Sequence, residues 1–411
     1  MTNPVCDPYL ILNKVYAQGA FLKQAISDTQ IEEQNRARTV KICYGVLEND
    51  LYFNACIKAF APKSPKLPIR IILKISLYML LFLQKPKYMV TDNAVELCKK
   101  LGKGGASGFI NAYLRAFDKK KVPAPKGEIA SLSFKYSYPE YAVSRLLKEY
   151  KKDAESIMAF RENKTCVRFS CSQEEEKIYA EHGEKTPFEH LYRFNSFRRD
   201  AGYDYGKYTF QSIGSVAICN VVEPCKNILD ACAAPGGKSV LLSEKCEKVT
   251  AFELHEHRTK LIEQYAMRMG ANNITAVCKD SSVFDENYQN SFDAVLCDVP
   301  CSGYGVVCDN PDIKLFRKEQ SLEELPETKF KILSTCSKYV KSGGYLYYST
   351  CSIFQSENDN VVGRFLKENP EFQVEKINSP LTCIQKKFGL QFLPHISCGA
   401  GFYVAKLKRQ S

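Results

Sequence analysis

Three short segments carry side chains whose types and spacing are suited to chemistry. The first, residues 228–239 (ILDACAAPGGKS), is an apolar run that breaks into a Gly-rich turn. The other two contain cysteine: residues 298–303 (DVPCSG) and residues 349–352 (STCS). A strand, a tight turn and a helix start in that order present backbone N–H groups to an anionic or electron-rich ligand. The turn has neither the dinucleotide pattern G-x-G-x-x-G nor the two fixed glycines of a P-loop, so alone it leaves the ligand open.

The two cysteine segments favour covalent chemistry on a pyrimidine ring. Carbon 5 of a pyrimidine is a poor nucleophile until a thiolate adds to carbon 6 and turns the ring into an enamine. Cys301 and Cys351 are both candidates, and the residues leave open which of them attacks. Asp298, protonated or hydrogen-bonding at ring nitrogen 3, would stabilise the charge that develops. For each cysteine alone, the alternative is a buried structural thiol.

Alternating strands and helices from residue 227 onward predict a parallel sheet that places these residues on one rim. Ligands bind beyond the carboxyl ends of such strands, where Glu253 would meet ribose hydroxyls and Asp280 an adenine edge. This rim suits a nucleoside cofactor that needs no phosphate contacts, which favours S-adenosylmethionine over NAD. The expected strands are 227–231, 249–253, 275–279, 293–297, 345–349 and a sheet-edge strand 402–407, and the expected helices are 239–245, 257–269, 328–341 and 358–368.

The N-terminal part has helical periodicity and an excess of positive charge. Apolar residues recur at helical spacings through residues 8–117. Residues 51–150 contain 18 Lys and Arg against 6 Asp and Glu, whereas residues 151–411 contain 34 of each kind. Such a local excess is the footprint of nucleic-acid binding, and a solvated basic surface without a partner is the alternative. We predict an all-helical domain over residues 1–120.

The middle of the chain is predicted to form a small α/β subdomain, residues 127–224, after a lysine- and proline-rich linker at 118–126. Ser137-Tyr138-Pro139-Glu140 has the S-x-x-E pattern of a capping box and predicts a helix through Tyr150. Strand-like segments at 165–171 and 191–197 lie on either side of a helical stretch at 173–181. A third domain then occupies residues 225–411.

The composition excludes several classes of protein. The chain has 411 residues, 45% apolar and 25% charged, which is typical of two or three globular domains. The longest apolar run, residues 71–83, contains Lys74 and Ser76 and is too polar for a membrane span. Without a secretory pattern at the start, we expect a cytoplasmic protein. Eighteen cysteines without a C-x-x-C pair predict reduced thiols and no metal site.

Residues 229–238, 298–303 and 348–352 closely resemble the three signature motifs of the RNA cytosine-5 methyltransferases of the Nol/Nop/Sun family. Residues 310–314 (NPDIK) and 401–407 (GFYVAKL) resemble further pieces of that family. The helical part is similar to a NusB-like RNA-binding domain at residues 36–38, 45–47, 78–82, 93–97 and 109–115. The resemblance covers nearly the whole chain. It implies a multi-domain protein with an all-α NusB-like bundle, a small α/β subdomain and an α/β Rossmann-like class I methyltransferase domain.

The resemblance also implies roles for individual residues. Cys351 would attack carbon 6 of a cytosine in ribosomal RNA, most simply that of the small subunit, and Cys301 would assist release of the product. Asp298 would contact the base, and Lys238 would lie near base or cofactor. We expect a monomer that binds ribosomal RNA and involves no membrane. The residues implied around S-adenosylmethionine are Ala233, Ala234, Pro235, Gly236, Gly237, Lys238, Glu253, Arg258, Asp280 and Asp298.

The chain departs from the family pattern at three places. Ser212 follows Gln211 where Asp is usual, Cys308-Asp309 replaces basic residues, and Ala400 replaces a common acidic residue. None of these changes removes a reacting group. The competing interpretations are a non-catalytic RNA-binding or antitermination factor, a methyltransferase acting on tRNA or another RNA, and a DNA cytosine methyltransferase that would use Cys301 alone.

Overall fold

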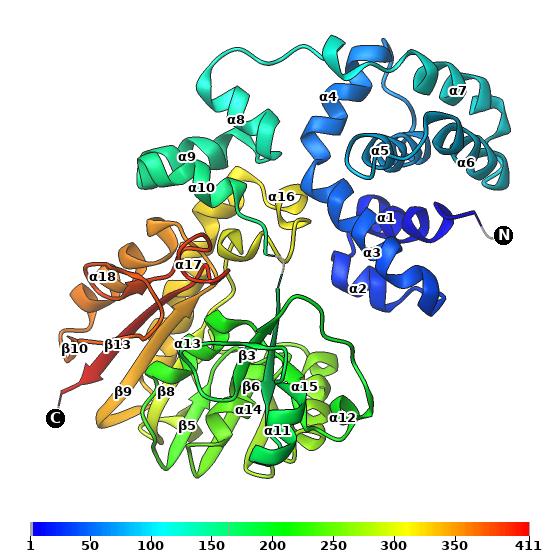
Figure 1. The fold of residues 1–411 in the computed structure, drawn as a ribbon. Coiled ribbons are helices and arrows are strands. Elements are labelled where there is room, and N and C mark those ends of the chain that lie inside the picture. Colours follow the sequence, from blue (N-terminus) through cyan, green and yellow to red (C-terminus); the bar gives the residue numbers. More distant parts are fainter. Residues whose placement is uncertain (1–2, 163, 411) are drawn as a thin grey trace. The chain divides into compact units, whose positions relative to one another are not determined.

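The computed structural model describes residues 3–162 and 164–410, which divide into two compact units (Figure 1). Unit 1 consists of Met1–Ala159 and Asp309–Arg317, and unit 2 of Phe160–Cys308 and Lys318–Ser411. In the described ranges, no helix has the length and apolar character needed to cross a bilayer.

Unit 1 is helical, as predicted, and is built around one core of buried aliphatic side chains. The most apolar helix, α5, has Pro68 in its first turn, where a missing N–H breaks no intrahelical hydrogen bond. Lys74 of α5 is buried and pairs with Asp50 at 2.5 Å, which explains how a charge lies within the apolar run. The first seven helices are α1 (Cys6–Gln18), α2 (Leu22–Ser27), α3 (Glu33–Glu48), α4 (Asp50–Phe60), α5 (Leu67–Leu81), α6 (Lys87–Lys100) and α7 (Ser107–Ala116).

Residues 127–159, which we assigned to the α/β subdomain, instead belong to unit 1 as α8 (Glu128–Tyr136), α9 (Glu140–Tyr150) and α10 (Ala154–Ala159). Phe134 of α8 packs edge-on against Tyr52 of α4 with ring centroids 5.1 Å apart. The helix at 140–150 is confirmed, but its capping box is wrong. Ser137 accepts a hydrogen bond from the Tyr52 N–H at 3.2 Å, and Pro139 starts α9 without a side-chain cap.

A segment from the middle of the methyltransferase-like sequence, residues 309–317, also packs in unit 1 and contains α16 (Ile313–Phe316). The Asp312 carboxylate accepts a hydrogen bond from Leu22 N–H at the start of α2, at 3.1 Å. The Lys314 ammonium donates to the carbonyls of Glu48 (2.8 Å) and Tyr136 (3.2 Å), where α3 and α8 end. A cation suits two helix C-termini, so the NPDIK segment fastens the chain into the helical unit.

Unit 2 begins with a four-stranded antiparallel sheet in the order β2-β3-β1-β4. Its core is aromatic, with Phe169, Phe194 and Tyr208 buried together. The strands at 165–171 and 191–197 and the helix at 173–181 are confirmed with shorter bounds. The elements are β1 (Thr165–Phe169), α11 (Gln173–Tyr179), β2 (Glu184–Lys185), β3 (Leu191–Phe194), α12 (Ala201–Asp204), β4 (Tyr208–Phe210) and α13 (Ile213–Val221).

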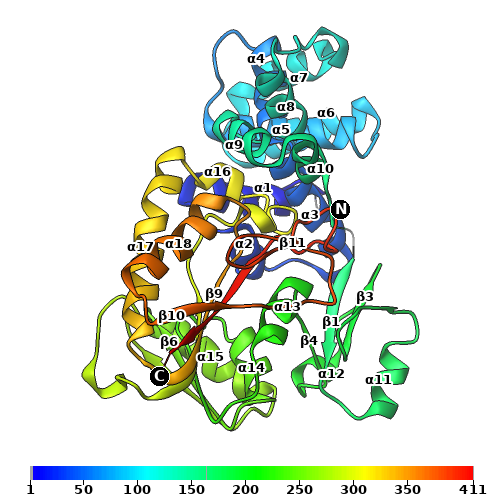
Figure 2. The ribbon, with the colours of Figure 1, turned by 90° about the vertical axis from the view of Figure 1, so that its left-hand side faces the viewer.

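The rest of unit 2 is a Rossmann-like sheet with helices on both faces (Figure 2). Its strands run in the order β11-β12-β13-β9-β8-β5-β6-β7, and the five from β9 to β7 are parallel neighbours. The strands are β5 (Asn227–Asp230), β6 (Lys248–Glu253), β7 (Ile274–Cys278), β8 (Phe292–Asp298), β9 (Val340–Thr350), β10 (Phe372–Glu375), β11 (Ile384–Gln385), β12 (Leu390–Gln391) and β13 (Tyr403–Arg409). The helices are α14 (Gly237–Ser243), α15 (Glu256–Arg268), α17 (Glu319–Ser337) and α18 (Asp359–Glu368).

Successive side chains of the central strands enter two different cores, because strand side chains alternate between faces. Ile228 and Leu296 pack with α13 and α14, whereas Leu229 and Val295 pack with α17 and α18. The expected position of the last strand is wrong. β13 is not at the edge: it pairs antiparallel with β9 and also with β10 and β12. Its residues from Tyr403 to Leu407 are buried, as an interior strand requires.

Candidate active site

The Gly-rich turn joins β5 to α14 and is closed by hydrogen bonding. Gly236 precedes α14 with φ +107°, and a Cβ there would lie 3.2 Å from the Cα of Ile262, so both the conformation and the packing favour glycine. Ser239 Oγ donates to Asp230 Oδ2 at 2.7 Å. Burial raises the pKa of Asp230 to about 6, although the Ser239 hydrogen bond opposes that shift. The turn therefore holds a buried carboxyl group beside the cofactor-facing backbone.

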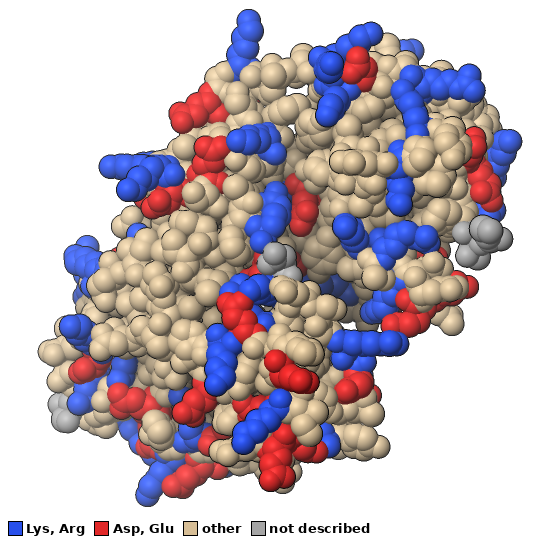
Figure 3. Space-filling model, viewed as in Figure 1, with Lys and Arg blue, Asp and Glu red and all other residues tan. Residues whose placement is uncertain are grey.

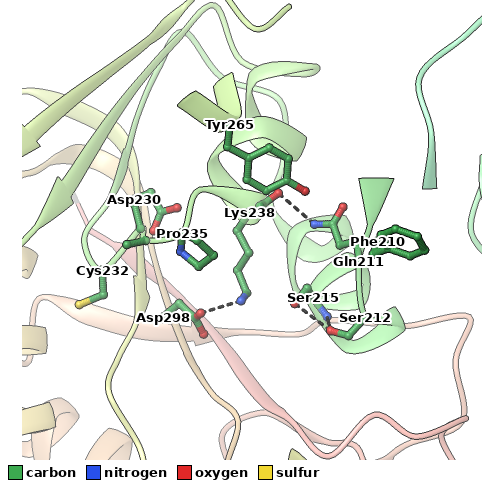
Figure 4. Close-up of a pocket in the computed structure, with 13 residues that line it drawn as sticks. Phe210, Gln211, Ser212, Ser215, Asp230, Cys232, Pro235, Lys238, Tyr265 and Asp298 are labelled. Atoms are coloured by element: carbon green, nitrogen blue, oxygen red, sulfur yellow. Dashed lines mark hydrogen bonds and ion pairs between the residues drawn. The ribbon is translucent and has the colours of Figure 1, made fainter. Parts of the chain in front are cut away.

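Lys238, in the first turn of α14, forms an ion pair with Asp298 at the end of β8 (Figure 4). The Lys238 Nζ lies 2.7 Å from Asp298 Oδ2, and Ser349 Oγ donates to Asp298 Oδ1 at 2.7 Å. Burial alone would lower the pKa of Lys238, but the Asp298 carboxylate outweighs burial and raises it above its usual range. The proton of the pair thus resides on Lys238.

A cavity of about 190 Å³ lies against this ion pair and the Gly-rich turn (Figure 4). Gln211 reaches the turn by donating its Nε2 hydrogen to the Gly237 carbonyl at 2.9 Å, while its Oε1 accepts from Arg168 at 2.8 Å. The cavity therefore joins the small sheet's end to the parallel sheet's rim. Its lining residues are Phe210, Gln211, Ser212, Ser215, Asp230, Cys232, Ala233, Ala234, Pro235, Gly237, Lys238, Tyr265 and Asp298.

A second cavity, of about 490 Å³, continues along the rim and shares Cys232, Ala234 and Asp298 with the first. Glu253 Oε1 accepts from His255 N–H (3.1 Å) and from Arg258 (3.3 Å). No hydrogen bond from the residues that the structure describes reaches the second carboxylate oxygen, which can therefore accept one from a ligand.

Asp280 also lines this second cavity and accepts from the Ser282 N–H at 2.8 Å, a bond that lowers its pKa. It is therefore ionised, ready to accept from an amino or hydroxyl donor. Two carboxylate acceptors and a bare Gly-rich turn on one rim match the hydroxyl and amino donors of a nucleoside such as that of S-adenosylmethionine.

The two candidate thiols lie together but line neither cavity. The Cys351 N–H donates to Cys301 Sγ at 3.2 Å, and Cys301 is 7% exposed. A second hydrogen bond, from the Cys351 thiol, lowers the pKa of Cys301, and this thiol–thiol hydrogen bond, with burial, raises the pKa of Cys351 well above its usual range. The first thiolate of the pair therefore forms on Cys301.

The structure brings most of the sequence-predicted site residues to the two cavities. Ala233, Ala234, Pro235, Gly237, Lys238, Glu253, Arg258, Asp280 and Asp298 line one or both cavities. Gly236 does not, because it faces α15 and shapes the turn from behind. Arg258 Nη2 also donates to the Ala234 carbonyl at 3.3 Å. The roles given to these residues remain predictions.

Sequence reasoning did not select Phe210, Ser215, Asp230 or Tyr265, which also line the first cavity. Asp230 was visible in the Gly-rich motif as a carboxylate at the end of a strand. Tyr265 gave no such signal, because it comes from the predicted helix at 257–269 and its hydroxyl meets Thr209 of β4 only through the fold.

Two departures from the family pattern have structural explanations. Ser212 accepts a hydrogen bond from the Ser215 N–H at 3.3 Å and caps α13, a position where Ser and Asp are about equally effective. Ala400 is 1% exposed, so the acidic side chain common in the family would need a partner in this buried position.

The Rossmann-like sheet, with its Gly-rich turn and its carboxylates at the strand ends, defines a class I methyltransferase. Residues 219–408 match the model of the 16S rRNA methyltransferase RsmB/F family, and residues 9–119 match the NusB family. Residues 219–408 therefore form a methyltransferase domain of the RsmB/F type, and residues 9–119 form a NusB-family domain. Its cofactor is S-adenosylmethionine.

Curated relatives match along almost the whole length. The probable ribosomal RNA small subunit methyltransferase B of Bacillus subtilis (strain 168) is 29% identical over 428 residues, covering 97% of this chain and 96% of that protein. The ribosomal RNA small subunit methyltransferase B of Serratia proteamaculans (strain 568) is 26% identical over 422 residues, with coverages of 97% and 96%.

Two solved structures support the fold. The crystal structure of PH0851 has a TM-score of 0.85 at 22% identity and covers 99% of this chain and 98% of that chain. The crystal structure of NSun6 from Pyrococcus horikoshii with SFG has a TM-score of 0.57 at 17% identity and covers 66% of this chain and 98% of that chain.

Proposed function

We propose that this protein methylates carbon 5 of a cytosine in ribosomal RNA, in the small subunit, through a covalent bond between Cys351 and carbon 6 of the base. The observation that carries the proposal is the placement of a hydrogen-bonded thiol pair beside a half-buried Lys238–Asp298 ion pair, on the rim that holds the cofactor cavity. A methyltransferase that acts on nitrogen or on a ribose hydroxyl has no need of two adjacent thiols.

The thiol pair supports addition to carbon 6. Cys301 accepts the proton of Cys351, and the Cys351 thiolate forms a bond to carbon 6, which makes carbon 5 a nucleophile. S-adenosylmethionine supplies the methyl group that carbon 5 takes up. Loss of the carbon 5 proton to a base then restores the ring's double bond as the carbon 6–sulfur bond breaks, returning the electron pair to Cys351. A Cys301 thiolate, re-formed after proton loss to solvent, is the base that lies beside Cys351.

The Lys238–Asp298 pair supplies the proton that balances this addition. Negative charge develops on ring nitrogen 3 as the thiolate adds, and the Lys238 ammonium, held by Asp298, is the group that donates a proton there. The Asp298 carboxylate then accepts hydrogen bonds from protonated nitrogen 3 and the exocyclic amino group. The proton returns to Lys238 when the ring becomes aromatic again.

The NusB-family domain is proposed to bind the RNA. Lys and Arg side chains gather over the helices of unit 1, whereas acidic side chains are more frequent over unit 2 (Figure 3). Attraction between such a surface and phosphates is independent of sequence, so unit 1 would supply affinity and unit 2 the choice of base.

The test is methyl transfer from labelled S-adenosylmethionine to small-subunit ribosomal RNA, with the product located by bisulfite sequencing. Cys351→Ala is expected to abolish transfer, and Cys301→Ala to accumulate a covalent RNA adduct. Methyl transfer to tRNA but not to ribosomal RNA would contradict the proposed substrate and assign the enzyme to tRNA. Loss of activity in Cys301→Ala without an adduct, with Cys351→Ala active, would reverse the roles of the cysteines and favour the mechanism of DNA cytosine methyltransferases.

A non-catalytic RNA-binding factor is the alternative that calorimetry addresses. It would bind RNA but not S-adenosylmethionine. A cofactor-binding protein with no methyl transfer to any cytosine-containing RNA would also contradict the proposal.

A further inference from the structure

A fully buried ion pair lies beneath the two cysteine segments. Lys329 of α17 and Glu357 of the 3-10 helix η6 (Gln355–Glu357) both have 0% side-chain exposure, and Lys329 Nζ is 2.8 Å from Glu357 Oε2. Taking both charges out of water is costly, and apolar side chains of similar volume often hold a fold at least as well. The pair therefore calls for a role besides stability.

The carboxylate of Glu357 ties the two cysteine segments to each other. Its Oε2 accepts from the N–H of Ser302 at 2.9 Å, and its Oε1 accepts from Ser352 Oγ at 2.6 Å. Ser302 directly follows Cys301, and Ser352 directly follows Cys351. The two serine hydroxyls are also 3.2 Å apart. One side chain thus fixes the residue after each thiol.

The next residue, Asn358, fixes the second segment from both sides of Cys351. Thr350 Oγ1 donates to Asn358 Oδ1 at 2.7 Å, and Asn358 Nδ2 donates to the Ser352 carbonyl at 3.0 Å. The Tyr348 hydroxyl donates to the Glu357 carbonyl at 2.5 Å. These contacts leave little freedom to the backbone that carries Cys351.

We propose that Lys329 and Glu357 are positioning residues for the thiol pair: the Glu357 carboxylate holds the Cys301 and Cys351 segments in register, and Lys329 keeps that carboxylate charged. The inference deepens the proposed function, on whose thiol chemistry it rests. The short contact between Cys351 N–H and Cys301 Sγ is the geometry that this register produces. The thiol–thiol hydrogen bond, through which the sulfurs exchange a proton, depends on the same register, because a hydrogen bond weakens steeply with distance and angle.

The two charges act on Cys301 in opposite directions, with Glu357 raising its pKa and Lys329 lowering it. Replacing both residues therefore changes the position of the thiols with little net change in local charge. The double variant Lys329→Met/Glu357→Gln separates position from charge for this reason. Ser352→Ala is a milder variant, since it removes one hydrogen bond to Glu357 and leaves the ion pair in place.

The experiment measures the pH dependence of alkylation at Cys301 and Cys351 by peptide mass spectrometry, on the intact chain without RNA. We expect the double variant to shift the Cys301 profile to higher pH, because the stabilising bond from Cys351 is weakened, and to reduce single-turnover methyl transfer at least tenfold. S-adenosylmethionine affinity should change less than threefold. Ser352→Ala should change both readouts in the same direction by less.

The matched control is Asp50→Asn, which breaks a different buried ion pair, with Lys74 in unit 1. It should leave both alkylation profiles as in the wild type. A folded double variant with wild-type alkylation profiles would overturn the proposal. If the double variant does not fold, unchanged profiles in Ser352→Ala would overturn it instead. If the wild type transfers no methyl group to RNA, the proposed function fails, whereas the thiol profiles still decide the positioning role.

Discussion

Asp230 is buried at the end of β5, and its replacement by asparagine should stabilise the protein. Asp230 is 1% exposed and its pKa is raised by burial from 3.8 to about 6. The folded state therefore favours the protonated form, so the carboxyl group's favourable contribution is present below pH 4 and is lost as the pH rises through 6. Raising the pKa from 3.8 to about 6 makes the ionised form of the buried carboxyl group cost about 3 kcal/mol at neutral pH.

Asp230→Asn removes the buried charge and keeps an acceptor for Ser239 Oγ. Because an amide accepts that hydrogen bond less strongly than a carboxylate, we expect a net gain of about 1–2 kcal/mol at pH 7.5. For a unit of this size, that gain raises the melting temperature by about 2–8 °C. The same variant should bind S-adenosylmethionine more weakly, since the carboxylate lines the cavity beside the Gly-rich turn.

The assay is urea unfolding followed by circular dichroism, since the chain has no tryptophan. Under reducing conditions, the gain of Asp230→Asn over the wild type should be small at pH 4.5 and should reach its full value above pH 6.5. Asp285→Asn is the control of opposite sign, because Lys279 lowers the pKa of Asp285 and the carboxylate is favourable at neutral pH. A variant that is no more stable than the wild type at pH 7.5, or equally more stable at both pH values, would refute the reasoning.

Three further predictions concern the site and its frame. Lys238→Met should lower single-turnover methyl transfer by about 10²–10⁴-fold at saturating cofactor, because the proton donor is lost; a rate within threefold of wild type would contradict that role. Gly236→Ala should lower the free energy of unfolding in urea by about 1–3 kcal/mol, because φ +107° is unfavourable for a residue with a Cβ. Gly270→Ala is the control for the added contact with Ile262, because Gly270 also has a positive φ but has open space around it. Lys314→Met should destabilise unit 1 by about 1–3 kcal/mol, because the carbonyls of Glu48 and Tyr136 lose their donor. Unchanged unfolding of unit 1 would show that this side chain does not anchor the NPDIK segment.

Local pattern predicted the parallel sheet well, because its strands are short apolar runs that end in polar residues at one rim. Glu253 and Asp298 are the last residues of β6 and β8, as expected. β13 was misplaced because it was expected simply as the last strand of the chain, whereas its place in the sheet is set by pairing with β9, β10 and β12.

The division of the chain into two units was predicted less well from the sequence than the parallel sheet was. The S-x-x-E pattern at Ser137 predicted a cap, but the hydroxyl group is used by Tyr52, which is 85 residues away in sequence. The anchoring of Lys314 in unit 1 also depends on contacts between residues far apart in sequence, since its two partners lie 266 and 178 residues away. Glu357 is likewise an ordinary acidic residue in the sequence, and only the fold places its carboxylate against both cysteine segments. Long-range contacts of this kind leave no periodic signal.

The central claim is that Cys351 bonds covalently to carbon 6 of the target cytosine. The most direct measurement uses small-subunit ribosomal RNA containing 5-fluorocytidine, which cannot lose a proton from carbon 5 and so traps the adduct. After incubation with S-adenosylmethionine and nuclease digestion, mass spectrometry should find the nucleotide on the peptide that contains Cys351, and Cys351→Ala should give none. A nucleotide attached to Cys301, or no adduct from an enzyme that is active on unmodified RNA, would contradict the account.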